Sequence, residues 1–187
     1  STSVVDYHNK VQPLARWFIE TADDVDLTDD TKGSWKVLYL FQDHNTSSDS
    51  SAHKLSLAGF ITLLHVNSPF RKPKPGVIVR VCQALILPPY HRAGHGSTML
   101  HCMHDYANAT NGGSNPILEI NVEDPAPGFV ALRDTVDYQR YMSLMPFADC
   151  SIMDKYLITE KEYFLPKSDV MLESFAEILK ITKRQCQ

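Results

Sequence analysis

The chain has 187 residues, 43% of them hydrophobic and 21% charged, which excludes a long disordered chain and is typical of one folded domain. Its 18 basic and 22 acidic side chains give a net charge of −4, which argues against direct nucleic-acid binding, because such binding normally requires a clustered basic face. No run reaches the ~18 apolar residues of a membrane span and the four cysteines are widely spaced, so we expect a soluble intracellular protein with reduced thiols and no membrane contact.

The first half of the chain predicts one helix followed by three strands. Apolar residues at helical spacing predict a helix over Val11 to Ala22, and an acidic loop follows it. Strand-forming residues fill Trp35 to Phe41, Leu55 to Val66 and Val77 to Leu87. The first two strands are expected to pair as a hairpin, and Pro88-Pro89 ends the third.

The second half predicts a helix, a short strand and a further helix. The helix is expected over Gly94 to Ala107 and the strand over Ile117 to Val122. Asp124-Pro125 is expected to start the next helix, because Asp is a good N-cap and proline suits the first helical position. The expected core residues of the two helices are Met99, Met103, Tyr106, Phe129, Leu132 and Val136. The remainder, to Gln187, is predicted to be helical with a break near Leu165-Pro166. This order predicts an α/β or α+β fold with antiparallel and parallel strand pairs.

The stretch from Leu85 to Ser97 carries the strongest chemical signal. A strand ends, a short loop turns, and a helix opens with Gly94 and Gly96 in its first turn. Free backbone N–H groups at a helix start bind anions, and glycine lets a phosphate approach closely. The spacing fits neither a dinucleotide-binding motif, because Met99 occupies the third glycine position, nor a P-loop, because no lysine follows Gly96. A tight turn without a ligand explains this segment equally well.

The two prolines indicate which ligand the segment suits. Pro88 and Pro89 cannot donate to a sheet ladder, so the third strand is expected to lose a neighbour at its end. A gap there allows an extended ligand with amide groups to pair with Leu85 to Leu87 as a surrogate strand. Pantetheine is such a ligand, and its pyrophosphate would lie over the helix start.

Four blocks resemble the type B histone acetyltransferase catalytic subunits of the GCN5-related N-acetyltransferase superfamily, and they occur in the family's order. They are Trp17-Phe18-Ile19-Glu20-Thr21-Ala22 with Asp26; Leu85-Ile86-Leu87-Pro88-Pro89-Tyr90 with Gly94-His95-Gly96; Val122-Glu123-Asp124-Pro125 with Phe129, Leu132-Arg133-Asp134 and Asp137; and Lys180-Ile181-Thr182-Lys183-Arg184-Gln185. Two positions depart from the family pattern: His91 stands where Gln is usual, and Ala126 replaces a common polar residue.

The resemblance implies a mixed, mostly antiparallel sheet flanked by helices and splayed at an acetyl-CoA cleft. It implies an acetyltransferase domain over residues 1–145 and a truncated C-terminal helical extension over 146–187. No metal is expected. The implied cofactor contacts are Ala84, Leu85, Ile86, Leu87, His91, Arg92, Ala93, Gly94, His95, Gly96, Ser97 and Phe129. For Phe129, packing in the core is an equally good explanation.

The implied reaction transfers acetyl from acetyl-CoA directly to a lysine in the N-terminal tail of newly synthesised histone H4. A lysine ammonium, with a pKa of about 10.4, must lose a proton before it can attack, so the site needs a base. The resemblance makes Glu123 that base, and a backbone N–H near Ile86 is expected to stabilise the oxyanion. Asp124 either contributes to catalysis or caps the following helix. Glu20 is implied near the lysine as a catalytic and substrate-binding residue, with Asp26 beside it, although Glu20 also fits as a charged helix end.

Two other functions remain open: transfer to another protein or a small amine, and a non-catalytic module that binds histone and acetyl-CoA. The resemblance implies a histone tail peptide and a WD-repeat histone chaperone as partners of a monomeric catalytic chain in the nucleus and cytoplasm. His101, His104 and Asp105 share a helical face, but that spacing is weak support for a metal site.

Overall fold

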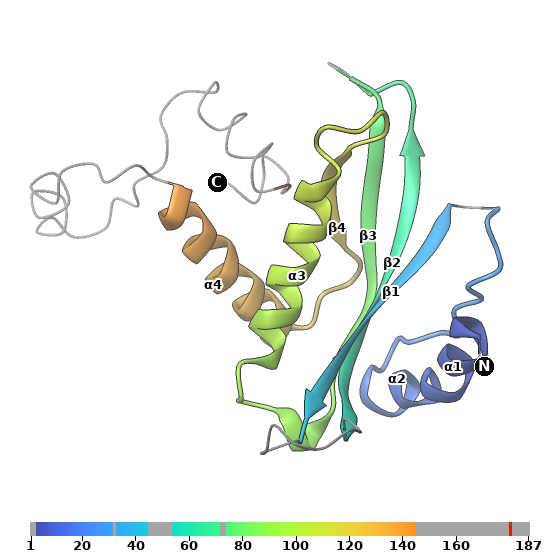
Figure 1. The fold of residues 1–187 in the computed structure, drawn as a ribbon, viewed down its shortest axis with the longest axis vertical. Coiled ribbons are helices and arrows are strands. Elements are labelled where there is room, and N and C mark those ends of the chain that lie inside the picture. Colours follow the sequence, from blue (N-terminus) through green and yellow to red (C-terminus); the bar gives the residue numbers. More distant parts are fainter. Residues whose placement is uncertain (1–2, 32, 45–53, 72–73, 145–179, 181–187) are drawn as a thin grey trace, which may run out of the picture.

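Figure 1 shows the computed structural model, which describes residues 3–31, 33–44, 54–71, 74–144 and 180. In these residues a four-stranded sheet carries two short helices on one face and two longer helices on the other (Figure 1). The expected mixed α+β fold, with helices flanking a mostly antiparallel sheet, is confirmed. No helix in the described part of the chain is long and apolar enough to span a bilayer.

The strands lie in chain order across the sheet. They are β1 (Ser34–Asp43), β2 (Leu55–Ser68), β3 (Gly76–Ile86) and β4 (Ile117–Val122). The first three pair antiparallel, whereas β4 pairs parallel to β3, because the helix α3 (His95–Ala109) carries the chain back before β4 begins. All four predicted strands are therefore present, and the predicted hairpin is confirmed.

The N-terminal helix differs from its prediction. The structure has two helices, α1 (Val4–Val11) and α2 (Pro13–Phe18), in place of one helix over Val11 to Ala22. A capping box fixes the start of α1: Asp6 N–H donates to the Ser3 hydroxyl, and Ser3 N–H donates to the Asp6 carboxylate. Pro13 opens α2, where its missing N–H costs nothing.

Apolar side chains cover both faces of the sheet. On the face beneath α3 and α4, strand residues pack with the buried side of the helices, and the most buried members are Ile61, Leu63, Val79, Val81, Leu100, Ala107, Ile117 and Val136. On the opposite face a smaller cluster forms beneath α1 and α2 from Ala15, Phe60 and Leu85. The central strands β2 and β3 are thus buried on both sides, which explains their nearly continuous apolar sequence.

The helix α4 (Pro127–Leu144) begins later than the sequence predicted. Phe129 N–H and Val130 N–H both donate to the carbonyl of Ala126, so Ala126, not Asp124, is the residue at the helix entrance. A residue before proline is pushed out of the helical region, so Ala126 cannot join the helix, and Pro127 takes its first position. Asp124 itself has a left-handed backbone, with φ of +44°. The prediction that Asp124 caps this helix was wrong.

The predicted C-terminal extension lies almost wholly outside the described residues, as does the predicted break at Leu165-Pro166. Lys180 is the exception. Its carbonyl accepts a hydrogen bond of 2.7 Å from Ile120 N–H, on the edge of β4 that faces away from β3.

Candidate functional site

The two parallel strands separate at Glu123. The register of β3 and β4 ends with Val81 opposite Val122, and Glu123 N–H then donates to the Val81 carbonyl at 2.9 Å. Beyond this point β3 continues to Ile86, and no strand of the described residues pairs with it on that side. We call the open edge of β3 from Cys82 to Ile86 the slot.

A β-bulge decides which backbone groups of β3 face the slot. Thr62 is opposite Gln83 and Leu63 is opposite Val81, so Cys82 is the extra residue. Past the bulge, Leu87 N–H donates to the carbonyl of Ala58 in β2, so the backbone groups of Leu87 face β2. Because backbone groups alternate along a strand, those of Ala84 and Ile86 face the slot.

The start of α3 is open to an anion. Gly94 precedes the helix with φ of +83°, and no side chain caps the helix there. A Cβ built on Gly94 would have no atom within 4 Å outside the adjacent residues, so the space beside this residue is open. Unpaired N–H groups at the positive end of the helix dipole, with no side chain in the way, suit a phosphate group.

Gly96 has a different reason to be glycine. A Cβ there would lie 2.8 Å from Cδ2 of Leu132 in α4. Gly96 therefore lets the two helices approach closely, which is a packing role in addition to the cofactor role predicted for it. Ser97 and His95 are half-buried in the same turn, and the His95 ring stands edge-on to Tyr90 with centroids 5.8 Å apart.

The loop between the strand and the helix folds back onto the strand. Its first part is a short 3-10 turn over Pro88–Tyr90, and Arg92 then adopts a left-handed backbone with φ of +59°. The His91 Nε2 atom lies 2.6 Å from the carbonyl oxygen of Ile86. A carbonyl only accepts, so Nε2 carries the proton and donates it. Arg92, Ala93 and Gly94 are exposed.

Glu123 lies at the fork with two side chains from β3. Its Oε1 is 3.7 Å from Nη1 of Arg80, and both side chains are about half exposed. Burial, the hydrogen bond to Glu123 and the charge of Glu123 raise the pKa of the Cys82 thiol to about 12. Arg80 alternates with Val79 and Val81, which face α3, so Glu123 meets it on the opposite face, where α1 and α2 lie.

The predicted acidic residues near the substrate lie on that same face. Ile19 and Ala22, on either side of Glu20, pack against the cluster around Leu85. Gln83 Nε2 donates to the Asp23 carbonyl at 2.6 Å, which fastens this segment to the end of β3 that forms the slot. Glu20 is therefore exposed on the face toward which Glu123 points.

The Asp26 carboxylate is engaged in a turn. It accepts from Thr28 N–H at 2.8 Å and from the Thr28 hydroxyl at 2.6 Å. These hydrogen bonds lower the pKa of Asp26 below its ordinary value. These contacts give Asp26 a local structural role, and its substrate contact stays a prediction.

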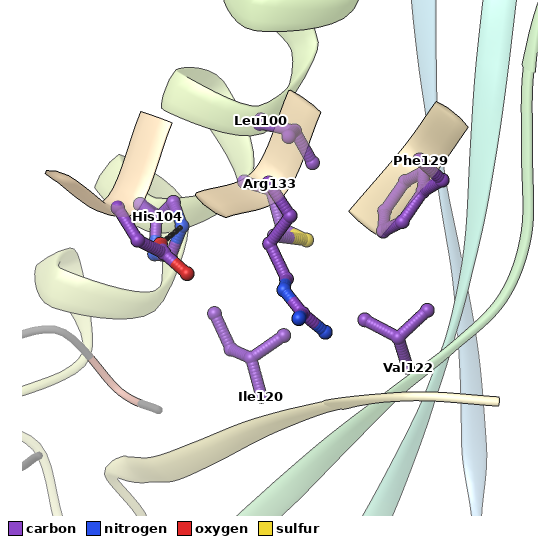
Figure 2. Close-up of a pocket in the computed structure, with 8 residues that line it drawn as sticks. Leu100, His104, Ile120, Val122, Phe129 and Arg133 are labelled. Carbon is purple, nitrogen blue, oxygen red and sulfur yellow. Dashed lines mark ion pairs between the residues drawn. The ribbon is translucent and has the colours of Figure 1, made fainter. Parts of the chain in front are cut away.

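Phe129 lies at the edge of the core. It lines a small pocket between α3, α4 and β4 together with Leu100, Met103, His104, Ile120, Val122, Arg133 and Asp137 (Figure 2). His104 Nε2 is 3.2 Å from Asp137 Oδ1, and this largely buried pair joins α3 to α4 (Figure 2). Among the described residues, no three His, Cys, Asp or Glu side chains are grouped so that they could hold a metal ion.

Three functional candidates were not found from the sequence: Arg80, Gln83 and the Ile86 carbonyl as the partner of His91. Arg80 and Gln83 do have a signal, since each is a polar residue inside an otherwise apolar strand. The partner of His91 has none, because the loop conformation alone brings the ring to the strand.

Comparison with known proteins confirms the resemblance drawn from the motifs. The chain is 34% identical over 131 residues to the histone acetyltransferase type B catalytic subunit of Rattus norvegicus, and 32% identical over 131 residues to that of Homo sapiens; each alignment covers 70% of this chain. A subunit of the same name from Dictyostelium discoideum is 30% identical over 135 residues, or 72% of the chain. The aligned part spans only 27% to 28% of these relatives. No family model matches the chain.

Among solved structures, an integron cassette protein from the mobile metagenome of V. cholerae matches with a TM-score of 0.40 and 14% identity. The match covers 89% of this chain and 88% of that one.

Proposed function

We propose that this chain, which is similar to type B histone acetyltransferase catalytic subunits over 70% of its length, is the acetyl-transferring part of a histone lysine acetyltransferase. One observation carries the proposal: the sheet opens beside Glu123, and the opening leads to the bare start of α3. A site of this shape offers a strand edge, an anion site and a carboxylate within one small region.

The chain's own groups fit acetyl-CoA. The backbone groups of Ala84 and Ile86 that face the slot can pair with the amides of the pantetheine arm, as a neighbouring strand would. The first-turn N–H groups of α3 would hold the pyrophosphate, and the missing side chain of Gly94 leaves room for it. When bound, acetyl-CoA supplies an acetyl group activated as a thioester.

Glu123 is proposed to take the proton from the incoming lysine, directly or through one water. Its position at the fork, with the carboxylate half exposed, leaves it accessible from the face that carries α1 and α2. The Arg80 guanidinium lies beside it, with Nη1 3.7 Å from Glu123 Oε1, in a weak and half-exposed ion pair. The N–H of Ile86 faces the slot and can donate to the acetyl carbonyl oxygen as negative charge develops there.

Cys82 is not suited to carry the acetyl group. Only a thiolate is a good nucleophile, and a pKa of about 12 keeps this thiol protonated near neutral pH. We therefore propose direct transfer to the lysine without an acetyl-enzyme.

The N-terminal segment is proposed to receive the substrate. The exposed Glu20 and the aspartates that follow it give this face negative charge, which suits the basic tail of a histone. From the family resemblance we propose newly synthesised histone H4 as the substrate, a WD-repeat histone chaperone as the partner, and nucleus and cytoplasm as the location.

The test is a Glu123→Gln variant of the full chain, measured for coenzyme A binding by calorimetry and for steady-state acetylation of a histone H4 tail peptide. We expect unchanged binding and a fall in kcat of about 10² to 10⁴, the usual contribution of a general base. Asp105→Asn is the matched control, because Asp105 is an exposed carboxylate on α3. Full activity of Glu123→Gln would refute the mechanism, and a higher rate on small amines than on the tail peptide would favour a different substrate.

A further inference from the structure

His91 donates a hydrogen bond to the Ile86 carbonyl, an acceptor that the slot would otherwise offer to a ligand. Its Nε2 donates to the Ile86 carbonyl oxygen at 2.6 Å. His91 is exposed, as are its neighbours Arg92 and Ala93.

The direction of the Ile86 carbonyl follows from the register. Leu87 bonds to Ala58 on the β2 side, so the backbone of Ile86 is directed to the other side, where β4 has already ended. An extended amide ligand that pairs with β3 there would need the same carbonyl as an acceptor for one of its N–H groups. His91 and the ligand therefore compete for one oxygen atom.

We propose that His91 is a two-position residue that controls entry to the slot: it bonds to Ile86 O, and it leaves this carbonyl to donate to the pyrophosphate when a pantetheine arm pairs with the strand. This inference rests on the proposed function, because it assumes that the slot takes coenzyme A. His91 lies three residues before Gly94, in the loop that leads to the start of α3, where the pyrophosphate is proposed to bind.

The exchange is favourable on simple energetic grounds. A hydrogen bond to a neutral carbonyl contributes about 1 kcal/mol net, which corresponds to about a fivefold change in affinity, whereas one to an anion contributes roughly twice as much. Loss of the carbonyl bond is therefore offset when the same N–H meets a phosphate. A ligand without phosphate offers no such replacement, and must displace His91 at a net cost.

This difference gives a test in which two ligands respond in opposite directions. We would measure binding of pantetheine, which has the amides without phosphate, and of coenzyme A to the wild type and to His91→Ala. Pantetheine should bind about fivefold more tightly to His91→Ala, because its competitor is gone. Coenzyme A should bind about fivefold or more weakly, because the contact to the phosphate is lost.

Two further variants control for unrelated effects. His91→Gln keeps a side-chain N–H donor and should retain most of the affinity for coenzyme A. His44→Ala is the matched control, because His44 is also exposed and its Nε2 also makes a hydrogen bond, 2.9 Å long, to the Ser56 hydroxyl outside the slot. It should change neither affinity.

An imidazole nitrogen NMR experiment reports on the ring itself. The free protein should show His91 with its proton on Nε2, and coenzyme A should shift the His91 signals while those of His44 stay in place. If coenzyme A binds but His91→Ala alters both affinities in the same direction, or the His91 signals do not move, this inference fails and the proposed function stands. If the wild type binds no coenzyme A, both fail.

Discussion

Replacing Gly94 by alanine separates the backbone requirement of the loop from the space that a ligand would use. Gly94 has φ of +83°, a conformation that costs an alanine about 1 to 2 kcal/mol. The added methyl group meets no atom within 4 Å, so no steric clash contributes to that cost. The free energy of unfolding should therefore fall by about 1 to 2 kcal/mol in urea titrations, an amount that leaves an ordinary domain folded.

The same methyl group would stand in front of the first turn of α3. If a phosphate approaches the backbone there, the affinity of the folded Gly94→Ala protein for coenzyme A should fall by about tenfold or more. Lower stability alone would not produce this loss, because the variant stays folded. Gly128→Ala is the control: Gly128 lies in α4 with open space at its Cβ, and alanine favours a helix by up to about 1 kcal/mol. Undiminished coenzyme binding by a folded Gly94→Ala protein would refute the anion site. Undiminished stability would show that the left-handed backbone is not required.

Two further predictions follow from buried groups. Burial lowers the pKa of His8 below its ordinary value of 6.5, so the unfolded chain takes up the proton first, and the free energy of unfolding should decline as the pH falls below about 6.5. His8→Phe should show a shallower decline in urea titrations, and equal slopes for the wild type and His8→Phe would contradict this cause. Cys82→Ala should keep kcat within about threefold, because a pKa of about 12 keeps the thiol protonated. For the same reason, mass spectrometry should find no acetylated Cys82 in the wild type during turnover. Detection of an acetyl group on Cys82 as an intermediate would refute direct transfer.

The strands could be predicted well from the sequence because their chemistry is local. β4 has the predicted bounds Ile117–Val122, and the other three strands differ from their predictions by a few residues at their ends. Runs of β-branched and aromatic residues between polar loops leave few alternatives for such segments. The same holds for α3, whose methionines Met99 and Met103 are buried as predicted.

The helix boundaries were harder because several residues compete to set them. Asp124-Pro125 and Ala126-Pro127 both place a proline where a helix could begin, and the restriction that Pro127 imposes on Ala126 agrees with the later start. The helix α1 was missed, although its capping box between Ser3 and Asp6 was visible in the sequence, because it has only eight residues and so a short apolar pattern. Local capping preferences are small compared with the packing energy that selects among them.

The site residues fall into two groups for the same reason. Gly94 and Glu123 lie where the motifs place them, at the helix start and at the end of a strand, because these positions follow directly from element boundaries. Asp26 and His91 have partners that depend on loop conformation: a turn with Thr28 and the carbonyl of Ile86. Sequence patterns do not specify loop conformation, so the contacts of these two side chains had to come from the structure.

The bulge at Cys82 is the feature on which the site depends most. Without it, the alternation set by Val77, Val79 and Val81 would continue, and Ala84 and Ile86 would direct their backbone groups to β2. The bulge reverses this phase. The last hydrogen bond between β3 and β2 is therefore made by Leu87, and the backbone N–H and C=O groups of Ala84 and Ile86 face the slot. The sequence of β3 does not reveal the reversal, because apolar residues occupy both faces of most of the strand, so the hydrophobic pattern does not distinguish the two phases.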